Sequence, residues 1–307
     1  MDNQDNRAPG AGLAATERPS RVSRRDFFRK ASAGAAAATL GVTYVSSVEA
    51  QEWAETTDVV VVGSGGAALA GAAGALDGGA KVNIYEKGPV AGGTTAKSGG
   101  QYWIPNSPFM AEAGIVDPKD DALKYMARLG FPTLYRAGDA KLGLSDHQYE
   151  MLSAFYDNAG PVIKTLHDEK ALPSAMAHTH GGEATPDCFA HLDEDVPKRG
   201  RTTDPLNSEG KPGYGGDIIV SLAGYCEAKG SPVITDTQVS RIVLDENRNV
   251  VGVEITDAAG ARLIRATRGV IFGSGGFTQN PEMRQNYLRM PVLGGCAVPT
   301  NQGDLVN

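Results

Sequence analysis

The chain has 307 residues, of which 41% are hydrophobic and 21% charged, so we expect a globular protein of about two domains with a buried core. The formal net charge of −7 argues against a nucleic-acid partner, because no basic stripe is present to neutralise phosphates. The three cysteines, Cys188, Cys226 and Cys296, form no CxxC pair, so we expect neither a disulfide framework nor a zinc site and interpret them as small buried apolar residues.

The N-terminal part of the chain, up to Ala50, predicts a disordered tail followed by an export signal. Residues 23–30 have the sequence SRRDFFRK, and a weakly apolar, Ala-rich run follows at 31–48. Val48 and Ala50 supply small residues for a cleavage site before Gln51. This arrangement resembles a twin-arginine signal, which implies export to the periplasm by the twin-arginine translocase. An amphipathic helix or a basic tail is the alternative, and the run is too weakly apolar for a stable membrane span.

The chain then continues with the pattern of a dinucleotide-binding fold. Residues 58–62, DVVVV, predict a parallel strand buried on both faces, and an Ala- and Leu-rich helix follows to about Leu76. The Gly-rich turn between them allows the backbone to approach a pyrophosphate, and the helix N-terminus directs free N–H groups at the phosphates. The predicted cofactor-binding residues of this turn are Gly63, Ser64, Gly65, Gly66, Ala67 and Ala68.

A second strand, residues 81–86, ends in a carboxylate. We expect Glu86 to accept hydrogen bonds from the ribose hydroxyls of the adenosine half of a cofactor, and we include Lys87 beside it in the site. Strand, turn, helix, strand and acid occur here in the right order, which favours a dinucleotide site over a doubly wound sheet without a nucleotide.

A second Gly-rich stretch at 92–105 distinguishes FAD from a nicotinamide cofactor. A nicotinamide-binding domain would normally resume a plain helix there, whereas this loop offers many backbone N–H groups and hydroxyls to a bulky flavin and its pyrophosphate. We therefore predict FAD as the cofactor. The predicted contacts from this loop are Gly92, Gly93, Thr94, Thr95, Ser98, Gly99 and Gly100.

The segments DVVVVGSGGAALAGA (58–72) and GGTTAKSGGQYWIP (92–105) resemble the FAD-binding family of fumarate reductases and 3-ketosteroid Δ1-dehydrogenases. The second segment is closer to the ketosteroid branch, and the similarity is loose over 130–210. The resemblance implies hydride transfer between flavin N5 and a CH–CH or C=C unit beside a carbonyl, with a small-molecule substrate that has an activated C–C bond and an unidentified electron donor or acceptor.

Two helices are predicted at 120–128 and 145–169. In the second, we expect an apolar stripe to face the core, formed by Leu152, Phe155, Val162 and Leu166. Tyr102, Tyr125 and Tyr156 are conceivable proton donors, but helix packing accounts for the last two, and the sequence assigns no catalytic residue.

The segment 170–210 is the part of this chain that we expect to reach a substrate. It holds His178, His180 and His191 among acidic residues, where the ketosteroid enzymes have an aromatic, Tyr-containing run. This difference favours a smaller or more polar substrate than a steroid. The histidine spacing matches no standard metal site, so we predict no metal and interpret the segment as a solvated lid loop.

A helix is predicted at 215–229, and a third parallel strand of the sheet follows at 232–236. An antiparallel meander follows, with strands at 239–244, 250–255 and 262–267. The resemblance implies that Val239 contacts the adenine through its backbone. A last parallel strand at 269–277 carries Gly275 and Gly276 to the cofactor.

Residues 299–304, PTNQGD, resemble a flavin-contacting turn of the family, which places Asp304 at the cofactor. In the family this turn introduces a capping domain and a closing FAD-binding segment, so we expect a C-terminally truncated chain. The predicted fold is α/β: an incomplete Rossmann-like FAD-binding domain over 51–307, a parallel sheet with an inserted antiparallel meander, and a helical and loop insertion at about 130–210. A non-catalytic FAD-binding remnant and, less favoured by the second Gly-rich loop, an NAD-dependent dehydrogenase are the alternatives.

Overall fold

Two sheets of unequal size organise the chain in a computed structural model that describes residues 41–44, 52–293 and 295–305. The larger sheet has seven strands in the order β1-β8-β9-β10-β2-β3-β7. Its strands are β1 (Gly41–Tyr44), β2 (Trp53–Val62), β3 (Val82–Tyr85), β7 (Val233–Ile234), β8 (Gln238–Leu244), β9 (Val250–Asp257) and β10 (Gly260–Phe272). The smaller sheet joins β4 (Tyr102–Trp103), β6 (Thr202–Pro205) and β5 (Ser174–Met176).

The large sheet has the predicted mixture of directions. Strands β10, β2, β3 and β7 run parallel to their neighbours, and β8, β9 and β10 form the antiparallel meander. The predicted tail and the SRRDFFRK motif lie outside the described residues. Residues 41–44, which the sequence assigns to the Ala-rich run, form a parallel edge strand on β8, so the sheet extends beyond the predicted domain boundary at Gln51.

The alternation of side chains along β2 divides the core between the two faces of the sheet. Val61 packs with α2 (Gly66–Asp77) and α6 (Gly215–Ala228), whose buried residues include Leu69 and Leu222. Val60 packs on the opposite face with buried side chains of the meander. Because both faces are covered, the run of valines can be apolar at every position.

The structure corrects the prediction of two separate strands at 262–267 and 269–277. These residues form one strand, β10, which pairs with β9 on one side and with β2 on the other and ends at Phe272. A register shift between Ala266 and Gly269 separates its two parts. Strand β10 pairs with β2 on both sides of this bulge, whereas its pairing with β9 ends at Arg265.

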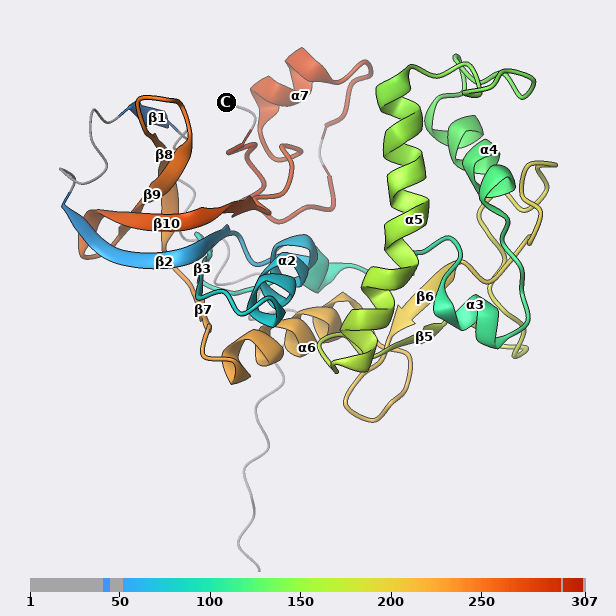
Figure 1. Cartoon of the computed structure of the whole chain (residues 1–307), viewed down its shortest axis with the longest axis horizontal. Coiled ribbons are helices and arrows are strands. Elements are labelled where there is room, and N and C mark those ends of the chain that lie inside the picture. Colours follow the sequence, from blue (N-terminus) through green and yellow to red (C-terminus); the bar gives the residue numbers. More distant parts are fainter. Residues whose placement is uncertain (1–40, 45–51, 294, 306–307) are drawn as a thin grey trace, which may run out of the picture.

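Helices α3 and α4 form a lobe with the small sheet beside the large sheet (Figure 1). The long helix α5 stands between the sheet and this lobe, and α7 lies near the C-terminal segment. Besides α2 and α6, the helices of the described residues are η1 (Thr95–Lys97), α3 (Pro108–Glu112), α4 (Lys119–Gly130), α5 (Asp146–Asp168) and α7 (Pro281–Tyr287). No helix among the described residues is long and apolar enough to span a membrane.

Helix α5 begins where the sequence predicts, because Ser145 and Gln148 form a reciprocal capping box. The predicted core stripe on this helix is wrong for two of its members, since Phe155 is 43% exposed and Val162 is 54% exposed. Helix α5 has 23 residues, and its neighbours cover only part of its surface. The 3.6-residue spacing of apolar side chains therefore identifies an apolar face but does not show whether another element covers it. Leu166, near the C-terminal end, is buried as predicted.

The three cysteines differ in their exposure to solvent. Cys226 is buried in the core beside α2, as expected for a small apolar residue. Cys188 and Cys296 are exposed, so the prediction of burial is wrong for them. Both lie in loops, where apolar neighbours in sequence do not form a continuous face.

We predict opposite effects for two glycine-to-alanine substitutions near α2. A Cβ at Gly273 would lie 2.4 Å from the Cβ of Ala68, so Gly273→Ala should lower the free energy of unfolding by about 1–3 kcal/mol through overpacking. A Cβ at Gly74, inside α2, would meet nothing within 4 Å, so Gly74→Ala should raise it by roughly 0.5–1 kcal/mol. Urea unfolding of both variants measures the difference, and equal stabilities would contradict the close contact at Gly273.

Candidate cofactor site

A cavity of about 580 Å³ opens at the carboxyl ends of β2 and β10. Its walls come from six separate parts of the sequence, which meet at this edge of the sheet. The lining consists of 62–67, 85–87, 93–95, 238–239 and 272–276 with Thr278, Ala297, Val298, Thr300, Asn301 and Asp304.

The turn from β2 into α2 forms the floor of the cavity. Gly63 has a φ of +93°, and a Cβ there would lie 2.5 Å from the carbonyl oxygen of Gly273, so any side chain is excluded on two grounds. Gly65 is the N-cap of α2 and has no side chain of its own to cap the helix, although the hydroxyl of Thr95 accepts from the N–H of Gly66 at 3.1 Å. The positive end of the helix dipole therefore faces the cavity without an acidic residue in the first turn to neutralise it.

Glu86 connects three loops around the cavity. Its Oε2 accepts hydrogen bonds from the backbone N–H of Ser64 at 3.0 Å and from the Ser64 hydroxyl at 2.6 Å. Its Oε1 accepts from the backbone N–H of Gly88 at 2.7 Å. The Ser64 hydroxyl in turn accepts from the N–H of Gly92 at 2.8 Å. Because a carboxylate has about four acceptor positions, Glu86 keeps capacity for a ribose hydroxyl while it holds the loops.

The C-terminal segment closes another wall of the cavity. Lys87 and Asp304 form an ion pair between the end of β3 and the last described turn. The backbone N–H of Gly303 donates to the carbonyl of Gly276 at 2.9 Å, and the side chain of Asn301 accepts from the N–H of Thr278 at 3.0 Å. Residues more than 200 positions apart in sequence thus form one site.

Most of the residues predicted to bind the cofactor line this cavity. Those in the lining are Gly63, Ser64, Gly65, Gly66, Ala67, Glu86, Lys87, Gly93, Thr94, Thr95, Val239, Gly275, Gly276 and Asp304. Ala68, Gly92, Ser98, Gly99 and Gly100 lie outside the lining, and their contact with the cofactor stays a prediction.

Four of these five residues make packing contacts or hydrogen bonds that hold the cavity walls together. Ala68 packs on Gly273, and a Cβ at Gly92 would lie 2.9 Å from Ile219 of α6. Gly100 has a φ of +86° and lies against the backbone that precedes α6, while the carbonyl of Ser98 accepts from the N–H of Gly215 at 3.1 Å. The side chains in the second half of the Gly-rich loop are therefore small because this part of the loop packs on α6.

Sequence reasoning missed several cavity residues, of which Ser274 is the most informative. Its hydroxyl is buried and has no hydrogen-bond partner among the described residues, although it lies in the cavity lining. A buried hydroxyl without a partner is costly unless a ligand satisfies it. The signal was its position directly before Gly275, at the end of a strand. Gln238, Phe272, Thr278 and Asn301 were also missed.

The tyrosines considered as proton donors have structural contacts. Burial raises the pKa of Tyr102 to about 12, and its hydroxyl is hydrogen-bonded to Ser174. Burial likewise raises the pKa of Tyr125 to about 12. Tyr156 donates to the backbone carbonyl of Asp117 at 2.6 Å. Their hydroxyls stay protonated at neutral pH, and the structure assigns none of them a catalytic role.

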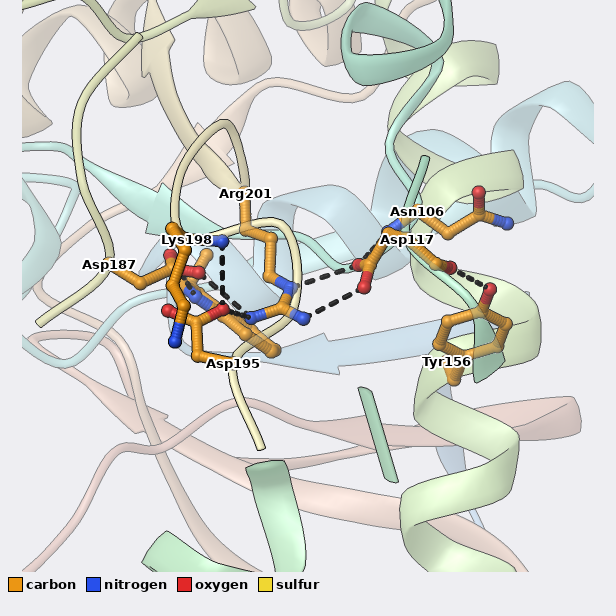
Figure 2. A network of polar contacts seen from close by, with 8 residues as sticks. Asn106, Asp117, Tyr156, Asp187, Asp195, Lys198 and Arg201 are labelled. Carbon is orange, nitrogen blue, oxygen red and sulfur yellow. Dashed lines mark hydrogen bonds and ion pairs between the residues drawn. The ribbon is translucent and has the colours of Figure 1, made fainter. Parts of the chain in front are cut away.

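A second polar cluster, centred on Arg201, lies outside the cavity (Figure 2). The guanidinium binds Asp117 through two hydrogen bonds of 2.8 and 2.9 Å, and its NH1 donates to Asp187 and Asp195 at 2.8 Å each. The side chains of all four residues are fully buried. Trp103 donates its indole N–H to Asp187 at 2.9 Å.

This cluster adds buried anchor points to the segment 170–210, which the sequence predicts to be a solvated lid loop and which is largely exposed between residues 178 and 199. Asp187 and Asp195 anchor the segment between β5 and β6 in the protein interior. His178, His180 and His191 are exposed on it, and among the described residues no group of three His, Cys, Asp or Glu is placed to hold a metal ion. No local sequence pattern indicates the anchor, because Asp117 and Arg201 are 84 positions apart.

Comparison with known proteins identifies the class of this fold. The model of the FAD binding domain family matches residues 58–305, so the chain belongs to that family. The 3-oxosteroid 1-dehydrogenase of Mycolicibacterium smegmatis is 28% identical over 295 residues, which cover 80% of this chain and 52% of the relative. The 4-oxocyclohexanecarboxylate 2-dehydrogenase of Sinomonas cyclohexanicum is 28% identical, with 81% and 48% covered.

Two further comparisons extend this result. The NADH:fumarate oxidoreductase of Klebsiella pneumoniae is 29% identical over 246 residues, which cover 80% of this chain and 23% of the relative. The crystal structure of 3-ketosteroid Δ1-dehydrogenase from Sterolibacterium denitrificans shares the fold, with a TM-score of 0.67 and 24% identity over 81% of this chain and 53% of that one. The chain spans about half the length of the two dehydrogenases that it matches in sequence.

The cofactor of this domain is FAD, as predicted, and the residues of the cavity fit it. The exposed positive end of α2 suits a pyrophosphate, Glu86 suits the ribose, and the unpartnered hydroxyl of Ser274 offers a donor to a bound ligand.

We predict that Glu86→Gln weakens FAD binding by roughly 10–100-fold, because hydrogen bonds to a charged group contribute about 1.5–3 kcal/mol. The amide places an NH2 group against the N–H donors of Ser64 or Gly88, so one of the loops must move. Glu112→Gln, on the exposed surface of α3, is the matched control. Quenching of flavin fluorescence on titration measures the dissociation constants, and equal values for both variants would refute the role of Glu86.

Proposed function

We propose that this protein is an FAD-dependent oxidoreductase that transfers a hydride between flavin N5 and a CH–CH or C=C unit adjacent to a carbonyl. The observation that carries the proposal is that the segments matched by the family model converge on one cavity suited to FAD. Relatives with dehydrogenase and fumarate oxidoreductase names support the same reaction class. FAD supplies the two-electron chemistry when bound.

The described residues would hold the cofactor and leave one end of it for the substrate. The turn 63–67 and the N-terminus of α2 would bind the pyrophosphate, and Glu86 the ribose. Thr94 and Thr95 would contact the other half from the second Gly-rich loop. Fixing the cofactor in this way lowers the entropic cost of bringing the reacting atoms together.

We propose a substrate that is smaller or more polar than a steroid, with an electron donor or acceptor of unspecified identity. The segment 177–200 supports this choice, since it exposes His178, His180 and Glu183 where an aromatic wall would suit a steroid. The anchoring of this segment on Arg201 holds these polar groups on an ordered surface.

The reaction class predicts a specific redox response of the bound flavin. In the FAD-loaded chain without oxygen, a cyclic ketone should bleach the absorbance of oxidised flavin, or the corresponding 2-enone should restore it after chemical reduction. The saturated alcohol of the same ring is the matched control, because it has no carbonyl to activate the C–C bond. A flavin that responds equally to ketone and alcohol, or to neither compound class in either direction, contradicts the proposal.

We further propose that the twin-arginine translocase exports the protein to the periplasm. The order of basic pair, Ala-rich run and small-residue cleavage site supports this proposal. A fold in which distant segments close one cofactor cavity suits a pathway that transports folded proteins. Cleavage before Gln51 would also remove the edge strand β1 from the sheet.

Substitution of both arginines tests export. Arg24→Lys with Arg25→Lys keeps the charge of the signal, so loss of the periplasmic fraction would show that the guanidinium pair itself is recognised. Arg29→Lys, which changes an arginine outside the pair, is the control and should leave export intact. Immunoblots of periplasmic and cytoplasmic fractions give the result, and equal export of the double variant and the control would exclude the twin-arginine route.

A further inference from the structure

The Arg201 cluster contains more negative charge than its one guanidinium can balance. Arg201 and Asp117 already form a complete, bidentate and electroneutral pair. Asp187 and Asp195 add two further carboxyl groups, and none of the four side chains has solvent exposure. If every carboxyl group were ionised, the cluster would carry a net charge of −2 in the protein interior, which is strongly unfavourable.

The surplus charges come from a single segment. Figure 2 shows Asp187 and Asp195 on one side of Arg201 and Asp117 on the other. Both carboxylates accept from the same guanidinium nitrogen, NH1, so they compete for one donor group. Oδ2 of Asp195 is buried and has no hydrogen-bond partner among the described residues. The hydrogen-bonding needs of the Arg201–Asp117 pair are therefore met, whereas those of the aspartates in the segment 177–200 are met only in part.

The other groups around the cluster do not neutralise it. Tyr125 from α4 and Tyr156 from α5 face it, and burial raises the pKa of each hydroxyl, so both stay neutral. Lys198 donates its backbone N–H to Asp195, but its ammonium group is directed to the carbonyl of Leu192. Burial also raises the pKa of Asp187, and the nearby Asp195 contributes to that increase.

We propose that Asp187 carries a proton when it lies beside Asp195 in the buried cluster and that this proton is required for the segment 177–200 to dock on the Arg201–Asp117 pair. The proton is taken from solvent when the segment docks and is returned to solvent when it leaves. Docking thereby reduces the net charge of the buried cluster from −2 to −1. This device is independent of the proposed oxidoreductase reaction.

Docking of the segment 177–200 is expected to weaken as pH rises, because docking takes up a proton. An aspartate carboxyl group has a pKa of about 3.9 when the segment is undocked, and burial on docking raises the pKa of Asp187. Docking is therefore strongest below about pH 4 and weakens as pH rises toward the raised pKa of docked Asp187, by up to about tenfold per pH unit. The Arg201–Asp117 pair remains in place, and the indole N–H of Trp103 loses its acceptor.

Trp103 provides the readout for the test. The FAD-loaded full chain with Trp53→Phe contains Trp103 as its single tryptophan. We expect its accessibility to acrylamide quenching to rise between about pH 5 and pH 8 as the segment undocks. Asp195→Asn removes one surplus charge and should make the quenching independent of pH. Asp193→Asn, an exposed neighbour in the same segment, should behave like the parent.

Three results would overturn the proposal. They are constant quenching of the parent over this pH range, the same pH profile for Asp195→Asn as for the parent, and loss of the profile in Asp193→Asn as well. If Asp195→Asn does not fold, Asp187→Asn serves as the second variant, because it also removes one surplus charge and leaves the Arg201–Asp117 pair intact. It should then lose the pH dependence in the same way.

Discussion

The cofactor site depends on a close approach of three elements at residues that have little or no side chain. The end of β2 at Gly63, the first turn of α2 at Ala68 and the end of β10 at Gly273 are packed so tightly that an added Cβ at either glycine would overlap its neighbour. This contact sets the angle at which α2 leaves the sheet. The positive end of the helix is thereby directed into the cavity.

The same region is stabilised by polar contacts that link distant segments. Glu86 binds Ser64, and Ser64 binds the N–H of Gly92, so one carboxylate fixes the relative positions of both Gly-rich loops. The ion pair between Lys87 and Asp304 joins the C-terminal turn to this arrangement. The segments that the family model matches therefore form the cavity for one physical reason: six of them meet at a shared edge of the sheet.

The parts of the fold that rest on local patterns were predictable, and the parts that rest on long-range pairing were not. The valine run, the turn at 63–68 and Glu86 indicate the dinucleotide fold because spacing alone specifies them. The continuity of β10 depends on its partners on both sides. The exposure of Phe155 depends on which neighbours cover α5, and the Arg201 cluster depends on aspartates that are far apart in sequence. No periodicity or motif encodes such contacts.

A structure of this chain with bound FAD tests the central claim most directly. The account predicts the pyrophosphate at the N-terminus of α2 against residues 63–67, a ribose hydroxyl hydrogen-bonded to Glu86, and a contact between the cofactor and the hydroxyl of Ser274. Glu86 should keep its bonds to Ser64 in that complex. FAD bound away from this turn, or a ribose without contact to Glu86, would contradict the account.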